Sequence, residues 1–134
     1  MRLDADDYLS QMSVQYMSTI LDNNPDISFV YADHLRITSD IKKPELVKLD
    51  TTKQLLLHGA GVLFRKNILD DNGGYDESLR NCEDYDLIAR LLKKGLNGHY
   101  LPLPLYRYFV QKDGLTSNED RRRIILKLGE KYGF

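Results

Sequence analysis

The stretch ISFVYADHLRIT, at residues 27–38, decides the fold. It is rich in the aromatic and β-branched residues that favour extended structure, so it predicts a long β-strand. Before it, apolar residues recur with the period of an amphipathic helix, which we expect to begin with Asp6 or Asp7 as N-cap and to end at residues 23–25, Asn-Asn-Pro. The apolar stripe of this helix consists of Leu9, Met12, Tyr16, Met17, Ile20 and Leu21.

Beyond this strand, helical and extended patterns continue to alternate. Residues 39–40, Ser-Asp, predict a turn, and residues 45–49 predict a returning hairpin strand. Further elements are expected in this order: a short helix capped by Thr51 or Thr52 (53–57), an apolar strand (62–64), one helical turn (67–71), an amphipathic helix (83–94), two short strands (99–101 and 105–110) and a last helix (119–132). Alternation of this kind is typical of α/β or α+β domains.

Composition limits the class of protein. The 134 residues fit a single domain, and 19 basic against 20 acidic residues give a net charge of −1, which argues against a nucleic-acid partner. One cysteine, Cys82, excludes an internal disulfide and fits a reducing compartment. No apolar run approaches the roughly 20 residues that span a bilayer, and no signal-peptide pattern begins the chain. We therefore expect a cytoplasmic protein.

An acidic cluster stands near the start of the chain, at Asp4, Asp6 and Asp7. At a strand end, Asp4 and Asp6 would point to the same side and offer oxygen ligands to Mg²⁺ or Mn²⁺. The alternative is an acid-rich helix start, which the helix dipole favours. A calcium loop is excluded by Leu9 and Gln15 at the positions that require Gly and Glu, and no nearby His or Cys supports zinc.

A second acidic pair, Glu83-Asp84, opens the predicted helix of residues 83–94. The structural interpretation is a capping box, with Asn81 as N-cap and Asp84 at its acidic position. The functional interpretation is a general base, because a helix N-terminus favours the ionised carboxylate. Sequence alone leaves both open.

Three segments in this order resemble the family 2 glycosyltransferases, which have the GT-A fold. They are residues 2–9 (RLDADDYL), 73–77 (GGYDE) and 83–87 (EDYDL), with Arg90 one turn later; Arg65 resembles an arginine that the family carries before the second segment. The resemblance implies an α/β fold, namely the C-terminal half of a Rossmann-like GT-A domain with a mixed β-sheet flanked by helices. It also implies that the nucleotide-binding half would precede residue 1, so that the chain starts within a longer fold.

The resemblance assigns roles residue by residue. Asp6 would ligate Mn²⁺ or Mg²⁺, Asp4 would contact the donor ribose or the metal, Asp84 would be the catalytic base, and Glu83 would orient the acceptor or a neighbouring side chain. The implied reaction is an inverting single displacement from a nucleotide-sugar donor to a glycan or lipid-linked acceptor, as in polysaccharide biosynthesis. Many relatives carry a metal-ligating His after a Tyr-Arg-Tyr strand, where this chain has Phe109.

Other residues have weaker functional interpretations. Arg107 would place positive charge near the donor diphosphate, and His58 with Gly59 would line the acceptor pocket, since small residues permit close approach. His34 and His99 are expected to be structural. The run Arg121-Arg122-Arg123 is a solvated helix face or a contact with anionic lipid, which would make the protein peripheral to the membrane. Residues 112–117 are either a connector or a segment that closes over the donor.

Two further functions compete with glycosyl transfer. A non-catalytic module would bind a partner or form a homo-oligomer through an exposed sheet surface. A metal-dependent phosphohydrolase is disfavoured, because no apolar strand precedes Asp4 and no second phosphate-binding motif is present.

Overall fold

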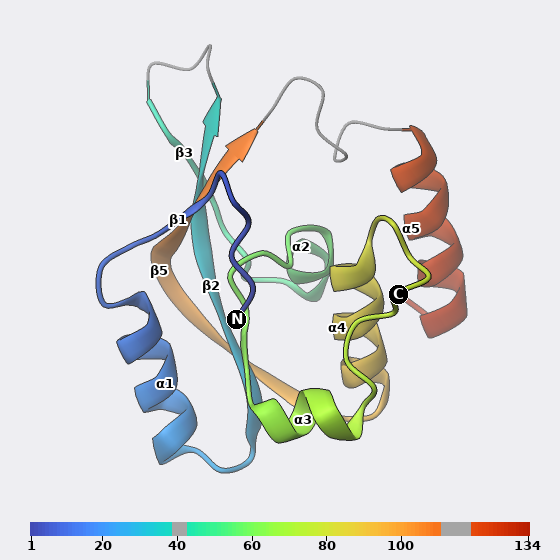
Figure 1. The fold of residues 1–134 in the computed structure, drawn as a ribbon, viewed down its shortest axis with the longest axis horizontal. Coiled ribbons are helices and arrows are strands. Elements are labelled where there is room, and N and C mark those ends of the chain that lie inside the picture. The colour runs from blue at the N-terminus through green and yellow to red at the C-terminus, as the bar shows by residue number, and fades with distance from the viewer. Residues whose placement is uncertain (39–42, 111–118) are drawn as a thin grey trace.

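The computed structural model describes residues 1–38, 43–110 and 119–134. Within these ranges an open, mixed β-sheet is covered by helices on both faces (Figure 1). The elements in chain order are β1 (Tyr8–Leu9), α1 (Ser13–Asn23), β2 (Ile27–Thr38), β3 (Glu45–Val47), α2 (Thr52–Leu57), β4 (Leu63–Phe64), α3 (Lys66–Asp71), α4 (Glu83–Lys93), β5 (Asn97–Val110) and α5 (Glu119–Tyr132). The α/β class predicted from sequence is confirmed.

Strand β2 is the centre of the sheet, as its apolar sequence predicts. The strand order is β1-β5-β2-β3, and β4 also pairs with β2. Strand β5 runs parallel to β2, whereas β1, β3 and β4 form antiparallel pairs. A parallel neighbour requires a crossover connection, and the described part of that connection includes α4, which lies between β4 and β5 in the chain.

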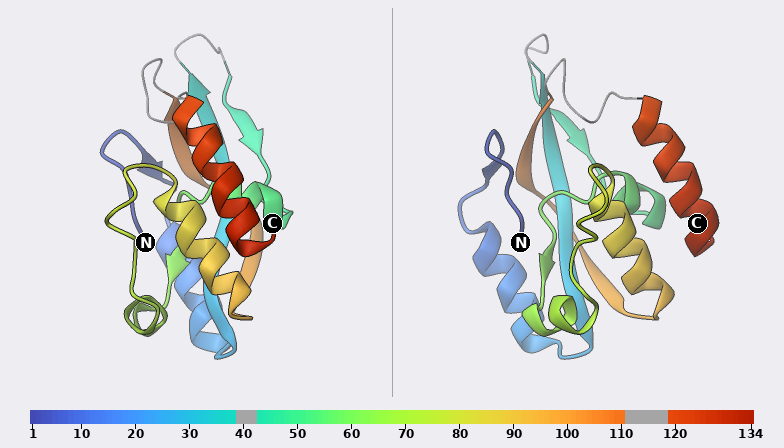
Figure 2. Two further views of the ribbon diagram at one scale, coloured as in Figure 1. Left: turned by 90° about the vertical axis from the view of Figure 1, so that its right-hand side faces the viewer. Right: turned by 45° about the vertical axis from the view of Figure 1, so that its right-hand side comes forward.

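Two apolar clusters lie on opposite faces of β2, because successive side chains of a strand alternate between faces. Val30 and Ala32 pack with Met17 and Leu21 of α1 on one face. Phe29 belongs to the larger cluster on the other face, where α4 contributes the fully buried Leu87, Ile88, Ala89 and Leu91. The views in Figure 2 show α1 on one side of the sheet and α4 with α5 on the other.

Most predicted elements are confirmed. The strand of residues 27–38, its hairpin partner and the last helix form as predicted, and Ile124, Ile125 and Leu128 of α5 face the core. Thr51 caps α2 by accepting a hydrogen bond from the backbone N–H of Gln54 at 3.2 Å. The predicted turn at residues 39–40 and the segment of residues 112–117 lie outside the described ranges.

Three expectations about boundaries are wrong. The first helix begins at Ser13, not after Asp6 or Asp7, because Tyr8 and Leu9 pair with β5 and form a strand. The two strands expected at 99–101 and 105–110 are one strand, β5, in which Pro102 and Pro104 coincide with register shifts against β2. The N-cap of α4 is Cys82 rather than Asn81, and Cys82 has a left-handed backbone with φ 65°.

No helix in residues 1–38, 43–110 or 119–134 combines the length and the apolar character needed to cross a bilayer.

Candidate functional site

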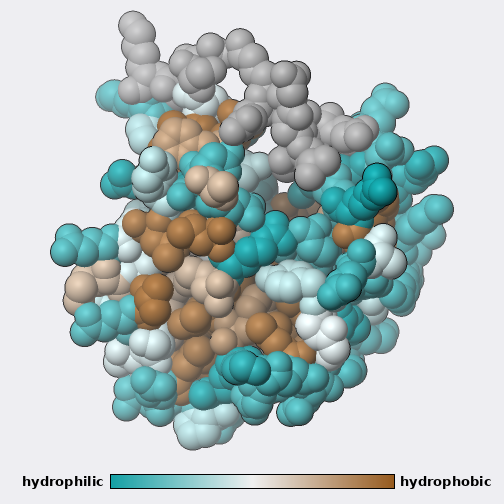
Figure 3. Space-filling view, viewed as in Figure 1, coloured by the Kyte–Doolittle hydropathy of each residue, from teal (hydrophilic) through white to brown (hydrophobic). Residues whose placement is uncertain are grey.

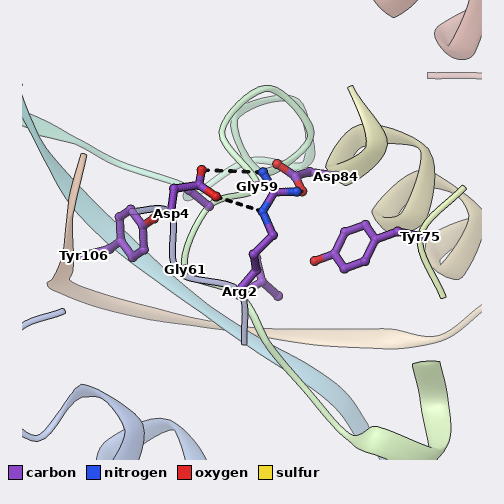
Figure 4. Close-up of a pocket in the computed structure, with 9 residues that line it drawn as sticks. Arg2, Asp4, Gly59, Gly61, Tyr75, Asp84 and Tyr106 are labelled. Carbon is purple, nitrogen blue, oxygen red and sulfur yellow. Dashed lines mark hydrogen bonds and ion pairs between the residues drawn. The ribbon is translucent and has the colours of Figure 1, made fainter. Parts of the chain in front are cut away.

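The two acidic segments meet through one arginine. Arg2 donates to both carboxylate oxygens of Asp4, from Nε to Oδ1 at 3.0 Å and from Nη2 to Oδ2 at 3.5 Å. Its Nη1 reaches Glu83 Oε1 at 2.5 Å and Asp84 Oδ1 at 3.2 Å. The guanidinium therefore lies between segments that are about 80 residues apart in the chain, as Figure 4 shows.

A small cavity surrounds this contact. It is lined from the N-terminal segment, from the loops between α2 and β4 and between α3 and α4, from the start of α4 and from β5. The lining residues are Arg2, Asp4, Gly59, Ala60, Gly61, Val62, Tyr75, Asp84 and Tyr106. Asp4 and Asp84, which the sequence assigns to one site, thus share a cavity.

Glycines allow the wall of this cavity to approach its acids. A Cβ on Gly59 would lie 2.8 Å from Ile88 Cδ1 and 3.1 Å from Asp84 Cβ. At Gly61, which has φ +70°, a Cβ would lie 2.6 Å from the ring of Tyr106. A side chain at either position would clash with these neighbours. Gly61 also favours glycine because its backbone is left-handed. Gly59 therefore permits close packing beside Asp84, and its role in an acceptor pocket stays a prediction.

Asp84 experiences opposing influences at the start of α4. Burial raises the pKa of its carboxyl to about 6; Arg2 acts to lower it, and the negative charges of Glu83 and Asp4 add to the increase. Burial dominates because the low-dielectric surroundings disfavour the charged form. At neutral pH the carboxylate is still mainly ionised, and it is a stronger base than an ordinary aspartate.

Tyr75 forms a further side of the site. Its ring centroid lies 5.8 Å from Arg2 Cζ, within the range of a cation–π contact. Burial and the charge of Asp84 raise the pKa of Tyr75 to about 12, so the phenol stays protonated at neutral pH. For Arg2 itself, burial disfavours the charged guanidinium. The contacts with the three carboxylates nevertheless hold the pKa of the guanidinium above its usual range.

Asp7 and Tyr106 fix the acidic segment to the sheet. Asp7 is buried and accepts hydrogen bonds from Tyr106 Oη at 2.5 Å and from the backbone N–H of Phe109 at 2.9 Å. Burial raises the pKa of the Asp7 carboxyl, while both hydrogen bonds act to lower it. This anchor explains why residues 7–9 are extended rather than helical.

The proposed metal ligands are not gathered as the sequence suggests. Asp4 to Asp7 form a turn, with the N–H of Asp7 donating to the carbonyl of Asp4 at 3.1 Å, so Asp4 and Asp6 are not alternate residues of a strand. Asp6 is exposed and is not among the residues that line the cavity. In the described part of the chain no three His, Cys, Asp or Glu side chains are placed to hold a metal ion. As placed, these residues do not fit a divalent cation.

Several other candidates lie away from the cavity. His58 packs on His34 with ring centroids 5.4 Å apart instead of lining the cavity. Arg107 is exposed on β5 opposite Tyr8, and Phe109 contacts the ring of Tyr8 at 5.7 Å. Arg65 donates to the carbonyls of Leu21, Asn24 and Ile27 around the end of α1, so its observed contacts are structural.

Sequence reasoning missed Arg2, Tyr75 and Tyr106 as parts of this site. Arg2 and Tyr75 both lie within the segments singled out for their acids and glycines, so their proximity to those motifs was the available signal. The pairing itself depends on contacts between distant segments, which a single sequence does not give.

No family model matches the chain, and no curated protein matches it significantly.

Proposed function

We propose that this chain is part of an inverting nucleotide-sugar glycosyltransferase. The single observation that carries the proposal is that Asp4 and the Glu83-Asp84 pair converge on Arg2 beside one cavity. Purely structural roles for these acids, as helix caps or solvated charges, give no reason for segments some 80 residues apart to meet. The resemblance of the motifs, taken with this geometry, favours glycosyl transfer over the other classes.

Asp84 is assigned the role of base. Its carboxylate takes the proton of an acceptor hydroxyl while that oxygen forms a bond to the anomeric carbon, and the bond to the nucleoside diphosphate breaks with its electron pair on the departing oxygen. A pKa of about 6 keeps the base mainly ionised at pH 7 and strengthens its attraction for the proton. Inversion follows because a single displacement occurs on the opposite face from the leaving group.

Neighbouring residues have supporting roles in this scheme. Arg2 holds the carboxylates of Asp84 and Glu83 in position, and Gly59 lets the backbone of its loop pack closely against the side chain of Asp84. Acceptors are glycans or lipid-linked sugars, as the motifs imply. The involvement of Mn²⁺ or Mg²⁺ stays a prediction of the resemblance; in the described part of the chain, the acidic residues as placed do not fit a metal ion.

The test is transfer from a panel of nucleotide sugars to oligosaccharide and lipid-linked acceptors, measured by mass spectrometry with added Mn²⁺, added Mg²⁺ or chelator. Replacing Asp84 with Asn should lower kcat by about 10²–10⁴-fold, the usual contribution of a positioned base. Glu77→Gln, an exposed acid in the neighbouring motif, is the matched control and should retain activity. Unchanged transfer in Asp84→Asn would show that the base is wrongly assigned.

A second candidate function has its own observation. Large apolar side chains of the first 16 residues are exposed, including Leu3 (47%), Tyr8 (62%), Val14 (50%) and Tyr16 (49%). Figure 3 shows apolar surface near the N-terminus and beside α1. An exposed patch of this kind favours self-association or a protein partner. Sedimentation equilibrium tests self-association: a monomer at all accessible concentrations contradicts it and leaves only a different protein partner.

A further inference from the structure

Arg90 of α4 does not line the cavity beside Asp84, but it bonds to the residue immediately before Tyr75, which does. We propose that Arg90 is a positioning residue for the base, because its bond to the carbonyl of Gly74 keeps Tyr75 in place at the wall of that cavity. The inference rests on the proposed function only for the role of Asp84 as base.

A buried carboxylate fixes the direction of the Arg90 side chain. Asp86, one turn earlier on α4, is only 2% exposed and accepts from Arg90 Nη2 at 2.9 Å and from Nε at 3.2 Å. The other oxygen of Asp86 accepts from Tyr132 Oη of α5 at 2.6 Å. A carboxylate buried in this way needs its charged and hydrogen-bonding partners, so the guanidinium is held firmly. In that orientation Nη1 donates to the carbonyl of Asn72, and Nη2 donates to the carbonyl of Gly74 at 2.8 Å.

The segment that Arg90 holds is not closely packed on this side. Residues 72–82 join α3 to α4 and form no helix or strand. A cavity of about 490 Å³ is lined by this segment, by α4 and by α5, and a Cβ added at Gly74 would meet no described atom within 4 Å. The N–H of Gly74 bonds back to the carbonyl of Leu69 in α3, whereas its own carbonyl bonds forward to Arg90. Hydrogen bonds rather than close contacts therefore fix the chain just before Tyr75.

Tyr75 forms one wall of the cavity around the Asp84 carboxylate. This cavity measures about 10 Å³, which is room for roughly one water molecule. Figure 4 shows the Tyr75 ring directed toward Arg2, beside Asp84. Burial is the largest influence on the pKa of Asp84, so a displaced ring would admit water and lower that pKa from about 6 toward 3.8.

Arg90 reaches the base through position rather than through charge. The charges that chiefly act on the pKa of Asp84 are, in decreasing order, those of Arg2, Glu83, Asp4 and Arg121. The guanidinium of Arg90 is paired with the buried Asp86 instead. A change in the pKa of Asp84 on altering Arg90 would therefore report the position of Tyr75.

The test is the pKa of Asp84, measured by ¹³C NMR titration of its carboxyl carbon with no donor or acceptor present and assigned with Asp84→Asn. Arg90→Lys keeps the positive charge beside Asp86 but loses the fork that reaches both carbonyls. It should lower the pKa of Asp84 by about one unit, and so should Tyr75→Ala, because both changes let water reach the carboxylate. When the two changes are combined, the fall should be no larger than in Tyr75→Ala alone, since Arg90 acts through that ring.

Arg36→Lys is the matched control, because Arg36 also pairs with a carboxylate, that of Glu45, but between β2 and β3. It should leave the pKa of Asp84 unchanged. Circular dichroism shows whether each variant is folded. If Arg90→Lys unfolds, Arg90→Gln combined with Asp86→Asn takes its place, since removing both partners leaves no buried charge unpaired, and the same fall is expected.

Three results would overturn the proposal. They are an unchanged or higher pKa of Asp84 in the folded Arg90 variant, an equal fall in Arg36→Lys, and a combined variant in which the two separate falls add. Because no transfer is measured, a lack of sugar transfer would contradict the proposed function and leave this result standing.

Discussion

Replacing Asp84 with Asn should change the stability of the protein in a pH-dependent way, increasingly in favour of the variant as pH rises from acid to neutral. The pKa of the Asp84 carboxyl is raised from 3.8 to about 6 in the folded protein. The folded state therefore binds the proton more strongly than the unfolded state, and the free energy of unfolding falls as pH rises through this interval. The penalty is absent below about pH 3.8, develops between there and pH 6, and is complete above it.

The magnitude follows from the size of the shift. About two pH units at about 1.4 kcal/mol each give about 3 kcal/mol, and screening of a side chain that is 31% exposed reduces this to about 2 kcal/mol. Asn cannot ionise, so Asp84→Asn lacks the penalty. The difference in unfolding free energy between the variant and the unaltered protein should thus grow by about 2 kcal/mol from pH 4 to pH 8.

Urea unfolding followed by circular dichroism at one-unit steps from pH 4 to pH 8, at constant ionic strength, measures this difference. A constant offset from the lost pairing with Arg2 does not matter, because only the change with pH is compared. Glu77→Gln, an exposed acid, serves as control and should show no comparable trend. A flat difference, or one of opposite sign, refutes the reasoning, since it would mean that Arg2 outweighs burial at Asp84.

Two other outcomes follow from the structure. Gly61→Ala should destabilise the fold by about 2–4 kcal/mol, since a Cβ would meet Tyr106 at 2.6 Å in a left-handed backbone; Gly73→Ala, with φ +76° and open space, should lose only about 1 kcal/mol. Similar losses of stability in Gly61→Ala and Gly73→Ala, measured by thermal unfolding, would contradict the steric clash with Tyr106. His34 is buried, and burial together with His58 lowers its pKa from 6.5 to about 4, so the unaltered protein should lose about 2–3 kcal/mol of stability relative to His34→Gln as pH falls from 7 to 4. Exposed His99→Gln is the control for the urea titrations, and parallel pH profiles for His34→Gln and the unaltered protein would contradict this prediction.

Elements with strong local patterns were predictable. Strand β2 carries a continuous run of strand-forming residues, and α5 carries Ile124, Ile125 and Leu128 on one face, so both form where the pattern places them. The start of α1 was not predictable, because Leu9 fits the helical stripe but pairs with Tyr106 in β5. A partner about 100 residues away outweighed the local preference, and nothing in residues 7–12 indicates it.

The candidate site, like the fold, was predictable only in part. Carboxylates at Asp4 and Asp84 were found because acidic motifs are visible in sequence, and the close approach at Gly59 was expected from its small neighbours. His58 was misplaced because its packing on His34 is a contact between the end of α2 and β2, which sequence spacing does not reveal. The left-handed Cys82 before Glu83 was also hidden, since non-glycine residues rarely adopt that backbone.

Arg2 and burial act on the base in opposite directions. In place, Arg2 acts to lower the pKa of Asp84 and so favours the ionised carboxylate, whereas burial and the charges of Glu83 and Asp4 raise that pKa. Without Arg2, the pKa of Asp84 would rise further, and a larger fraction of the carboxyl would be protonated near neutral pH. Removal of Arg2 is therefore expected to weaken the base near neutral pH, an effect that a purely structural salt bridge would not produce.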